Sequence, residues 1–198
     1  MIRQRREERL QVRERQQRQT TITRFAIAAA VLLAVGAAVL IGTNIVRDRE
    51  LNQAPVGVES FPDPGAGHVD GPVAYAQTPP VGGEHSPVWQ NCGYYAAPVA
   101  SEAGVHSLEH GAVWITYQPD LPAEQVETLR GLAEDQSFIL VSPFPDLPAP
   151  VVASSWGEQV RLDSADDQRL AQFVRVYRLG PRTPELGAAC TGGTAATL

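Results

Sequence analysis

Four histidines are the residues of this 198-residue chain best suited to chemistry, and all four lie in or beside one stretch of irregular composition. They are His68, His85, His106 and His110. If residues 99–110 form a helix, His106 and His110 stand four positions apart and face the same way. Two imidazoles at this spacing suit a single metal ion, and the adjacent Glu109 offers a carboxylate. The stretch therefore predicts a divalent-metal site, and imidazole and carboxylate ligands favour Zn or Cu(II).

Other functions account for the same residues. Single histidines commonly serve as surface polar groups or as hydrogen-bonded core residues, so the first alternative is a metal-free, non-catalytic interaction module. Its loop of His, Trp and Tyr would contact a protein partner at the cell envelope. The second alternative is a hydrolase, because residues 106–110 (HSLEH) match the inverted zinc-peptidase signature, with Glu109 as general base. Gly104 and Gly111 leave room for only one or two helical turns, and Glu185 would have to supply the third ligand, so a non-enzymatic role is favoured.

Cys92 and Cys190 are the only cysteines of the chain. Outside the cytoplasm two cysteines usually pair, and this bridge would tie the C-terminal tail to the histidine-bearing stretch. Closing a loop of about 100 residues contributes up to roughly 4 kcal/mol to stability. The alternatives are that Cys92 is a metal ligand or a nucleophile.

The charges of the chain divide around one uncharged segment. Residues 1–24 hold eight Arg and three Glu, whereas residues 47–198 hold eight Arg and nineteen acidic residues. Residues 25–46 carry no charge, and a helix of this length crosses a bilayer core of roughly 30 Å. Because the Arg-rich flank comes first, we expect a cytoplasmic N-terminus and a C-terminal part outside the cell membrane. The overall charge of −6 argues against a nucleic-acid binder, and the length excludes a TIM barrel.

A cleaved signal peptide is the alternative to this membrane anchor. Its apolar region would span about 7–15 residues after a short basic region. Both regions are longer here, so an uncleaved signal anchor is favoured. Small residues recur at spacing four along the segment, which would let two helices approach closely in a homodimer. This stripe consists of Ala30, Ala34, Ala38 and Gly42. Because the whole chain is rich in Ala, a chance origin of the stripe is favoured over a dimer contact.

The part after the apolar segment divides into a linker, a domain and a tail. Residues 47–66 contain Pro and acidic residues without apolar periodicity and predict an extended linker. Residues 67–186 form the expected extracytoplasmic domain, and residues 187–198 form the tail. Residues 67–104 are dense in Pro, Gly and aromatic residues, with a short strand expected at 73–75. Irregular stretches of this length are uncommon in compact domains and are often functional.

Regular elements follow the irregular stretch. The apolar patterns predict strands at residues 112–117, 138–142 and 151–156 and helices at 123–135 and 165–178, the last capped by Asp163 or Ser164. This order predicts an α+β fold, a small domain with a mainly antiparallel sheet and two helices on one face.

Three motifs taken together resemble one protein family. Residues 85–89 read H-x-P-x-W, residues 92–95 read CG-x-Y, and residues 106–114 read HSLEHGAVW. Over roughly residues 67–180 the chain resembles the bacterial membrane-anchored family catalogued as domain of unknown function 3105. The resemblance implies one N-terminal membrane helix, and it implies no particular activity. It also places five residues in the family's motif, which are His85, Cys92, His106, Glu109 and His110.

Overall fold

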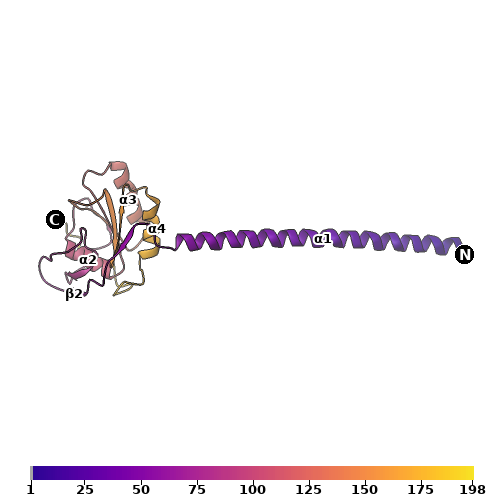
Figure 1. The fold of residues 1–198 in the computed structure, drawn as a ribbon, viewed down its shortest axis with the longest axis horizontal. Coiled ribbons are helices and arrows are strands. Elements are labelled where there is room, and N and C mark those ends of the chain that lie inside the picture. Colours follow the sequence, from indigo (N-terminus) through magenta and orange to yellow (C-terminus); the bar gives the residue numbers. More distant parts are fainter. Residues whose placement is uncertain (1) are drawn as a thin grey trace. The chain divides into compact units, whose positions relative to one another are not determined.

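The computed structural model describes residues 2–198, and the chain divides into two units (Figure 1). The first unit ends at Glu50 and consists of almost all of the long helix α1 (Ile2–Leu51). Within α1, Ala30–Arg49 is long and apolar enough to cross a membrane by length and composition. This span overlaps the segment 25–46 that the sequence predicts.

The second unit is built on a six-stranded sheet with the strand order β1-β8-β7-β5-β6-β4. The β1–β8, β8–β7 and β7–β5 pairs are antiparallel, whereas β6 pairs in parallel with both β5 and β4. The prediction of an α+β fold with a mainly antiparallel sheet is therefore confirmed. The strands are β1 (Val58–Ser60), β4 (Gly93–Tyr94), β5 (Val113–Tyr117), β6 (Ile139–Pro143), β7 (Val151–Ser155) and β8 (Glu158–Leu162).

Helices cover both faces of this sheet. They are α2 (Ser101–Glu109), α3 (Ala123–Asp135) and α4 (Gln168–Tyr177). Both α3 and α4 share a core with Val113 and Ile115, which are alternate residues of β5. Trp114 lies between those two residues, so it faces the other side of the sheet, where it packs with Leu108 of α2. The two helices expected on one face are thus α3 and α4, and α2 forms a further layer on the opposite face.

The helix α3 is the crossover that the parallel pairing of β5 and β6 requires. It has the bounds 123–135 that the apolar spacing predicts. The start of α4 is predicted wrongly, because the helix begins three residues later than expected. Its N-cap is Asp167, which accepts a hydrogen bond from the Arg169 amide. The Ala165 amide is instead held by the side chain of Gln125 from α3, so the chain turns there before the helix begins. The sequence predicts either Asp163 or Ser164 as the cap.

Two short strands organise the irregular stretch, and the strand expected at residues 73–75 is absent among the described residues. The strands β2 (Ala66–His68) and β3 (Gly83–His85) form a separate parallel pair. Residues 73–75 form no strand. The Val73 amide donates a hydrogen bond to a side-chain oxygen of Glu102, and the Tyr75 hydroxyl donates one to the Glu84 carbonyl of β3. Upstream, the segment 47–66 contains the edge strand β1, so the expected linker contributes to the main sheet.

Candidate metal site

The pairing of β2 with β3 brings the first two histidines together. His68 and His85 occupy opposite positions of this parallel pair, so their side chains leave the same face. The centroids of the two rings are 4.9 Å apart. The His85 side chain is fully buried, whereas that of His68 is 45% exposed. His68 therefore lies on the solvent side of the site.

The last turn of α2 supplies the other candidate ligands. His106 and Glu109 are three positions apart, His110 is the C-cap, and all three are buried. The helix lies close to the sheet because Gly104 packs on Trp114, where a Cβ atom would come within 2.7 Å of the indole ring. The helix dipole places partial negative charge at this C-terminus, which favours a bound cation.

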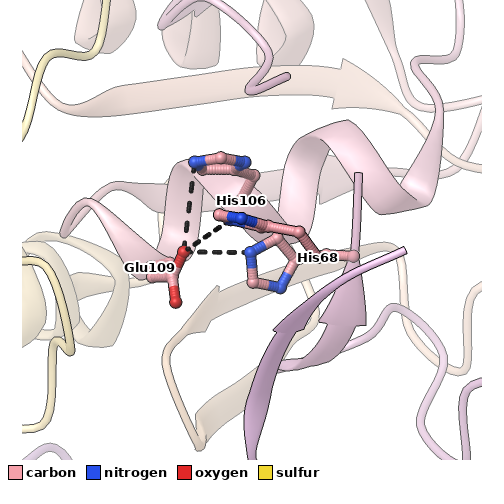
Figure 2. A group of neighbouring side chains, drawn as sticks. His68, His106 and Glu109 are labelled. Atoms are coloured by element: carbon pink, nitrogen blue, oxygen red, sulfur yellow. Dashed lines mark hydrogen bonds and ion pairs between the residues drawn. The ribbon is translucent and has the colours of Figure 1, made fainter. Parts of the chain in front are cut away.

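Glu109 lies at the centre of a first group of ligand atoms (Figure 2). Its Oε2 atom is 2.9 Å from Nε2 of His85, 3.6 Å from Nε2 of His68 and 3.9 Å from Nε2 of His106. Figure 2 shows the rings of His68 and His106 turned toward this carboxylate. All four ligand atoms lie within 4.8 Å of one another. These four residues could therefore hold a metal ion.

Backbone carbonyls orient the three buried histidines through Nδ1. The acceptors are Gly83 for His85 at 2.7 Å, Ser86 for His106 at 2.6 Å and Ala189 for His110 at 2.6 Å. A carbonyl oxygen can only accept a hydrogen bond, so each Nδ1 carries the proton and donates it. In the neutral ring each Nε2 then keeps a free lone pair, and this is the form in which histidine binds metals.

A second group of ligand atoms adjoins the first. Nε2 of His106 is 3.0 Å from Nε2 of His110, which is in turn 3.5 Å from Oε2 of Glu185. The ligand atoms of these three residues also lie within 4.8 Å of one another. Burial lowers the pKa of the His106 imidazole below its usual range, and the neighbouring His110 acts in the same direction. The neutral form of His106 is therefore favoured.

The segment that follows α4 brings Glu185 to this second group. The Glu185 amide donates to the Glu109 carbonyl at 3.0 Å, and the Gly187 amide donates to the His110 carbonyl at 3.1 Å. These hydrogen bonds satisfy carbonyls that the end of α2 leaves without helical partners. The carboxylate of Glu185 is consequently positioned by the backbone next to His110.

A disulfide between Cys92 and Cys190 fastens the C-terminal segment, with the two Cα atoms 5.4 Å apart. Cys190 comes directly after Ala189, whose carbonyl oxygen accepts the hydrogen bond that orients His110. A parallel β-bridge between Gln90 and Thr194 adds a second contact between the same two segments. Residues 187–198, expected as a tail, are therefore attached beside the histidines. Neither thiol is free to act as a metal ligand or a nucleophile.

Two indole rings flank the histidines. The ring centroid of Trp89 is 5.6 Å from that of His106 and 5.0 Å from that of His110. The ring of Trp156 meets His85 edge-on at 5.9 Å. Apolar walls of this kind restrict the access of water to a metal site.

The structure brings together all five candidate ligands expected from the sequence. His68, His85, His106 and Glu109 form the first group, and His110 joins His106 in the second. Glu185 is expected from the sequence only as the third ligand of a peptidase, yet it completes the second group. The sequence around Glu185 does not indicate a ligand, because Glu185 lies far from His110 in the sequence. It reaches His110 only through irregular backbone.

The second unit is thus an α+β domain that encloses a buried cluster of imidazole and carboxylate groups. Residues 68–192 match the family described as "Protein of unknown function (DUF3105)". This match covers more than half of the chain, so the protein belongs to that family and the resemblance seen in the motifs is confirmed. No curated protein and no solved structure matches the chain.

Proposed function

We propose that the protein is a membrane-anchored extracytoplasmic domain that binds a divalent Zn or Cu ion through His68, His85, His106 and Glu109. The observation that carries the proposal is the arrangement of the buried imidazoles. The Nδ1 atoms of His85 and His106 face backbone carbonyls, and their Nε2 atoms lie 2.9 and 3.9 Å from the buried carboxylate of Glu109. The biological role would be metal handling or metal-supported binding at the cell envelope.

Electrostatics supports a cation at the centre of this group. The side chains of His85, His106 and Glu109 are 0%, 4% and 6% exposed. A buried carboxylate next to an unprotonated imidazole nitrogen is unfavourable, because both groups are hydrogen-bond acceptors and neither has a proton to donate. A divalent cation satisfies both. The partly exposed His68 would lie where the ion enters.

Two further features support the proposed location. The Arg-rich residues 1–24 precede the apolar helix, which favours a cytoplasmic N-terminus. The disulfide suggests that the second unit matures in an oxidising compartment. Homodimerisation through the small-residue stripe of α1 and contact with an envelope protein partner stay predictions.

Metal analysis of the full chain, purified in detergent and reconstituted with Zn²⁺ or Cu²⁺, tests the proposed function. We expect at least one bound equivalent in the wild type. His85→Asn and Glu109→Gln should each lower the affinity by at least roughly 10–100-fold, because each removes a group that holds the cation. Asp70→Asn is the matched control, since Asp70 is an exposed acid close to His68 that belongs to neither ligand group.

The contrary result is equally measurable. A folded wild-type chain that retains less than about a tenth of an equivalent after reconstitution would contradict metal binding, since binding should be strong at a preformed site. Circular dichroism of the same samples establishes that the chain is folded. That outcome would favour the metal-free interaction module instead.

A further inference from the structure

Two imidazole nitrogens face each other in the interior of the domain without a proton to share. Both His106 and His110 donate Nδ1–H to carbonyls, at Ser86 and Ala189, yet their Nε2 atoms are only 3.0 Å apart. Two neutral rings held in this way direct lone pair against lone pair. Such a contact is stable only if a cation or an added proton lies between the nitrogens. The opposite carboxylate of Glu185, 3.5 Å from Nε2 of His110, adds negative charge at the same point.

From this contact we infer a second metal position formed by His106, His110 and Glu185, so that the domain holds two divalent cations side by side. The inference rests on the proposed metal-binding function and extends it from one cation to two. His106 determines how the ligands divide between the cations. Its Nε2 lies within reach of both groups, but its single available lone pair serves only one cation at a time.

With two cations bound, both positions have the same types of ligand. Assigning His106 to the second position leaves His68, His85 and Glu109 for the first. Each cation is then held by two imidazoles and one carboxylate, with at least one coordination position left for water or an external ligand. With a single cation bound, His106 is free to join the first group.

In each group one distance lies within the range expected for neighbouring ligands on one metal, and one lies slightly above it. Neighbouring ligand atoms on a metal bound at about 2.0–2.1 Å are about 2.9–3.4 Å apart for angles between square and tetrahedral. In the first group the distances from Glu109 Oε2 to the imidazoles of His85 and His68 are 2.9 and 3.6 Å. In the second group the corresponding distances along His106, His110 and Glu185 are 3.0 and 3.5 Å.

The two positions differ in access and in the way they are built. The first is formed by β2, β3 and α2, and its carboxylate is buried. The second depends on the segment after α4, and the side chain of Glu185 is 53% exposed. Both groups draw on the last turn of α2, where the helix dipole favours positive charge. The second cation should therefore exchange more readily with solvent than the first.

Stoichiometry and magnetic coupling in the full chain, purified in detergent, test the second position. We expect two equivalents of Zn²⁺ by titration calorimetry and elemental analysis. Glu185→Gln and His110→Gln should each leave one tightly bound equivalent, whereas Asp70→Asn should keep both. Because Glu185 is exposed and its backbone makes the structural hydrogen bonds, Glu185→Gln should fold even if His110→Gln does not.

Copper provides an independent readout. Two Cu²⁺ ions bound side by side should give a half-field electron paramagnetic resonance signal in the wild type. Glu185→Gln should lose that signal and show only isolated Cu²⁺. A single equivalent in the wild type, unchanged by Glu185→Gln and without coupling, would overturn the second position and leave the proposed function standing. Failure to retain any Zn²⁺ or Cu²⁺ would overturn both.

Discussion

At the scale of single residues, the site is oriented by the main chain. The buried imidazoles of His85, His106 and His110 each donate to a carbonyl, and no other side chain holds them at Nδ1 among the described residues. A carbonyl acceptor is insensitive to the identity of the residue that bears it. Ligand geometry should therefore tolerate side-chain changes at Ser86 and Ala189, provided that the local backbone keeps its course.

Asp167 is a residue-scale determinant of stability outside the site. It caps α4 by accepting from the Arg169 amide, and its carboxylate also pairs with the Arg169 guanidinium at 2.6 Å. Asp167→Ala should lower the free energy of unfolding by about 1 kcal/mol at neutral pH. Urea unfolding followed by circular dichroism measures this loss, with Asp167→Asn as the control that keeps an N-cap acceptor.

The pair of Asp167 and Arg169 also predicts that the stability of the domain depends on pH. Hydrogen bonding from Arg169 holds the pKa of Asp167 below its ordinary value of 3.8. The ionic part of the stabilisation is therefore present above that value and is lost as the pH falls through the lowered pKa. The stability difference between wild type and Asp167→Ala should shrink in this acidic range. A difference of constant size from neutral pH to well below 3.8 would contradict the role of the ion pair.

At the scale of elements, the position of α2 depends on one glycine. A Cβ at Gly104 would lie 2.7–2.9 Å from three atoms of Trp114, which is fully buried and donates to Ser142 Oγ at 3.0 Å. The indole has no room to retreat, so Gly104→Ala should destabilise the domain by roughly 1–3 kcal/mol. It should also weaken Zn²⁺ binding, because α2 carries ligands of both groups.

Gly131→Ala is the matched control for this prediction. Gly131 also lies inside a helix, α3, but a Cβ there would meet nothing within 4 Å. Helix propensity then favours Ala by up to about 1 kcal/mol. Chemical unfolding of both variants, with Zn²⁺ titration of each, separates the two effects. Equal stability of the two variants would contradict the close packing of α2 on the sheet.

Elements with a strong periodic pattern could be predicted from the sequence, and those fixed by tertiary contacts could not. The helix α3 and the strand β5 show clear apolar patterns, and both lie where expected. The strand β8 escapes prediction because Glu158 and Gln159 are buried polar residues, which Arg182 and Ser154 satisfy. The strands β2 and β3 have three residues each, too few for a pattern to emerge.

Part of the candidate site could likewise be predicted from the sequence, and part depends on tertiary contacts. The types and the spacing of His106, Glu109 and His110 on one helix suffice to predict that these side chains lie close together. The approach of His68 to His85 depends on the register of a short parallel pair, which the residues do not encode locally. Glu185 arrives through hydrogen bonds between irregular backbone and the end of α2, so only the folded chain reveals it.

At the scale of the whole molecule, the disulfide links the irregular stretch 67–104 to the C-terminal segment. It joins residues 98 positions apart in the sequence. Replacing both Cys92 and Cys190 by Ser should lower the free energy of unfolding by about 2–5 kcal/mol. Thermal unfolding with and without a reducing agent measures the loss, and the double variant should be insensitive to the reductant. Identical unfolding of the oxidised and reduced wild type would contradict this contribution.

The placement of Ala189 directly before Cys190 has a consequence for the maturation of the protein. The carbonyl that orients His110 is held near α2 by the disulfide, and so is the segment that bears Glu185. A newly synthesised chain with reduced thiols would therefore meet cytoplasmic metal with an incomplete second position. With the proposed extracytoplasmic location, export and oxidation would have to precede full loading, so the chain would acquire its second metal ion only after export.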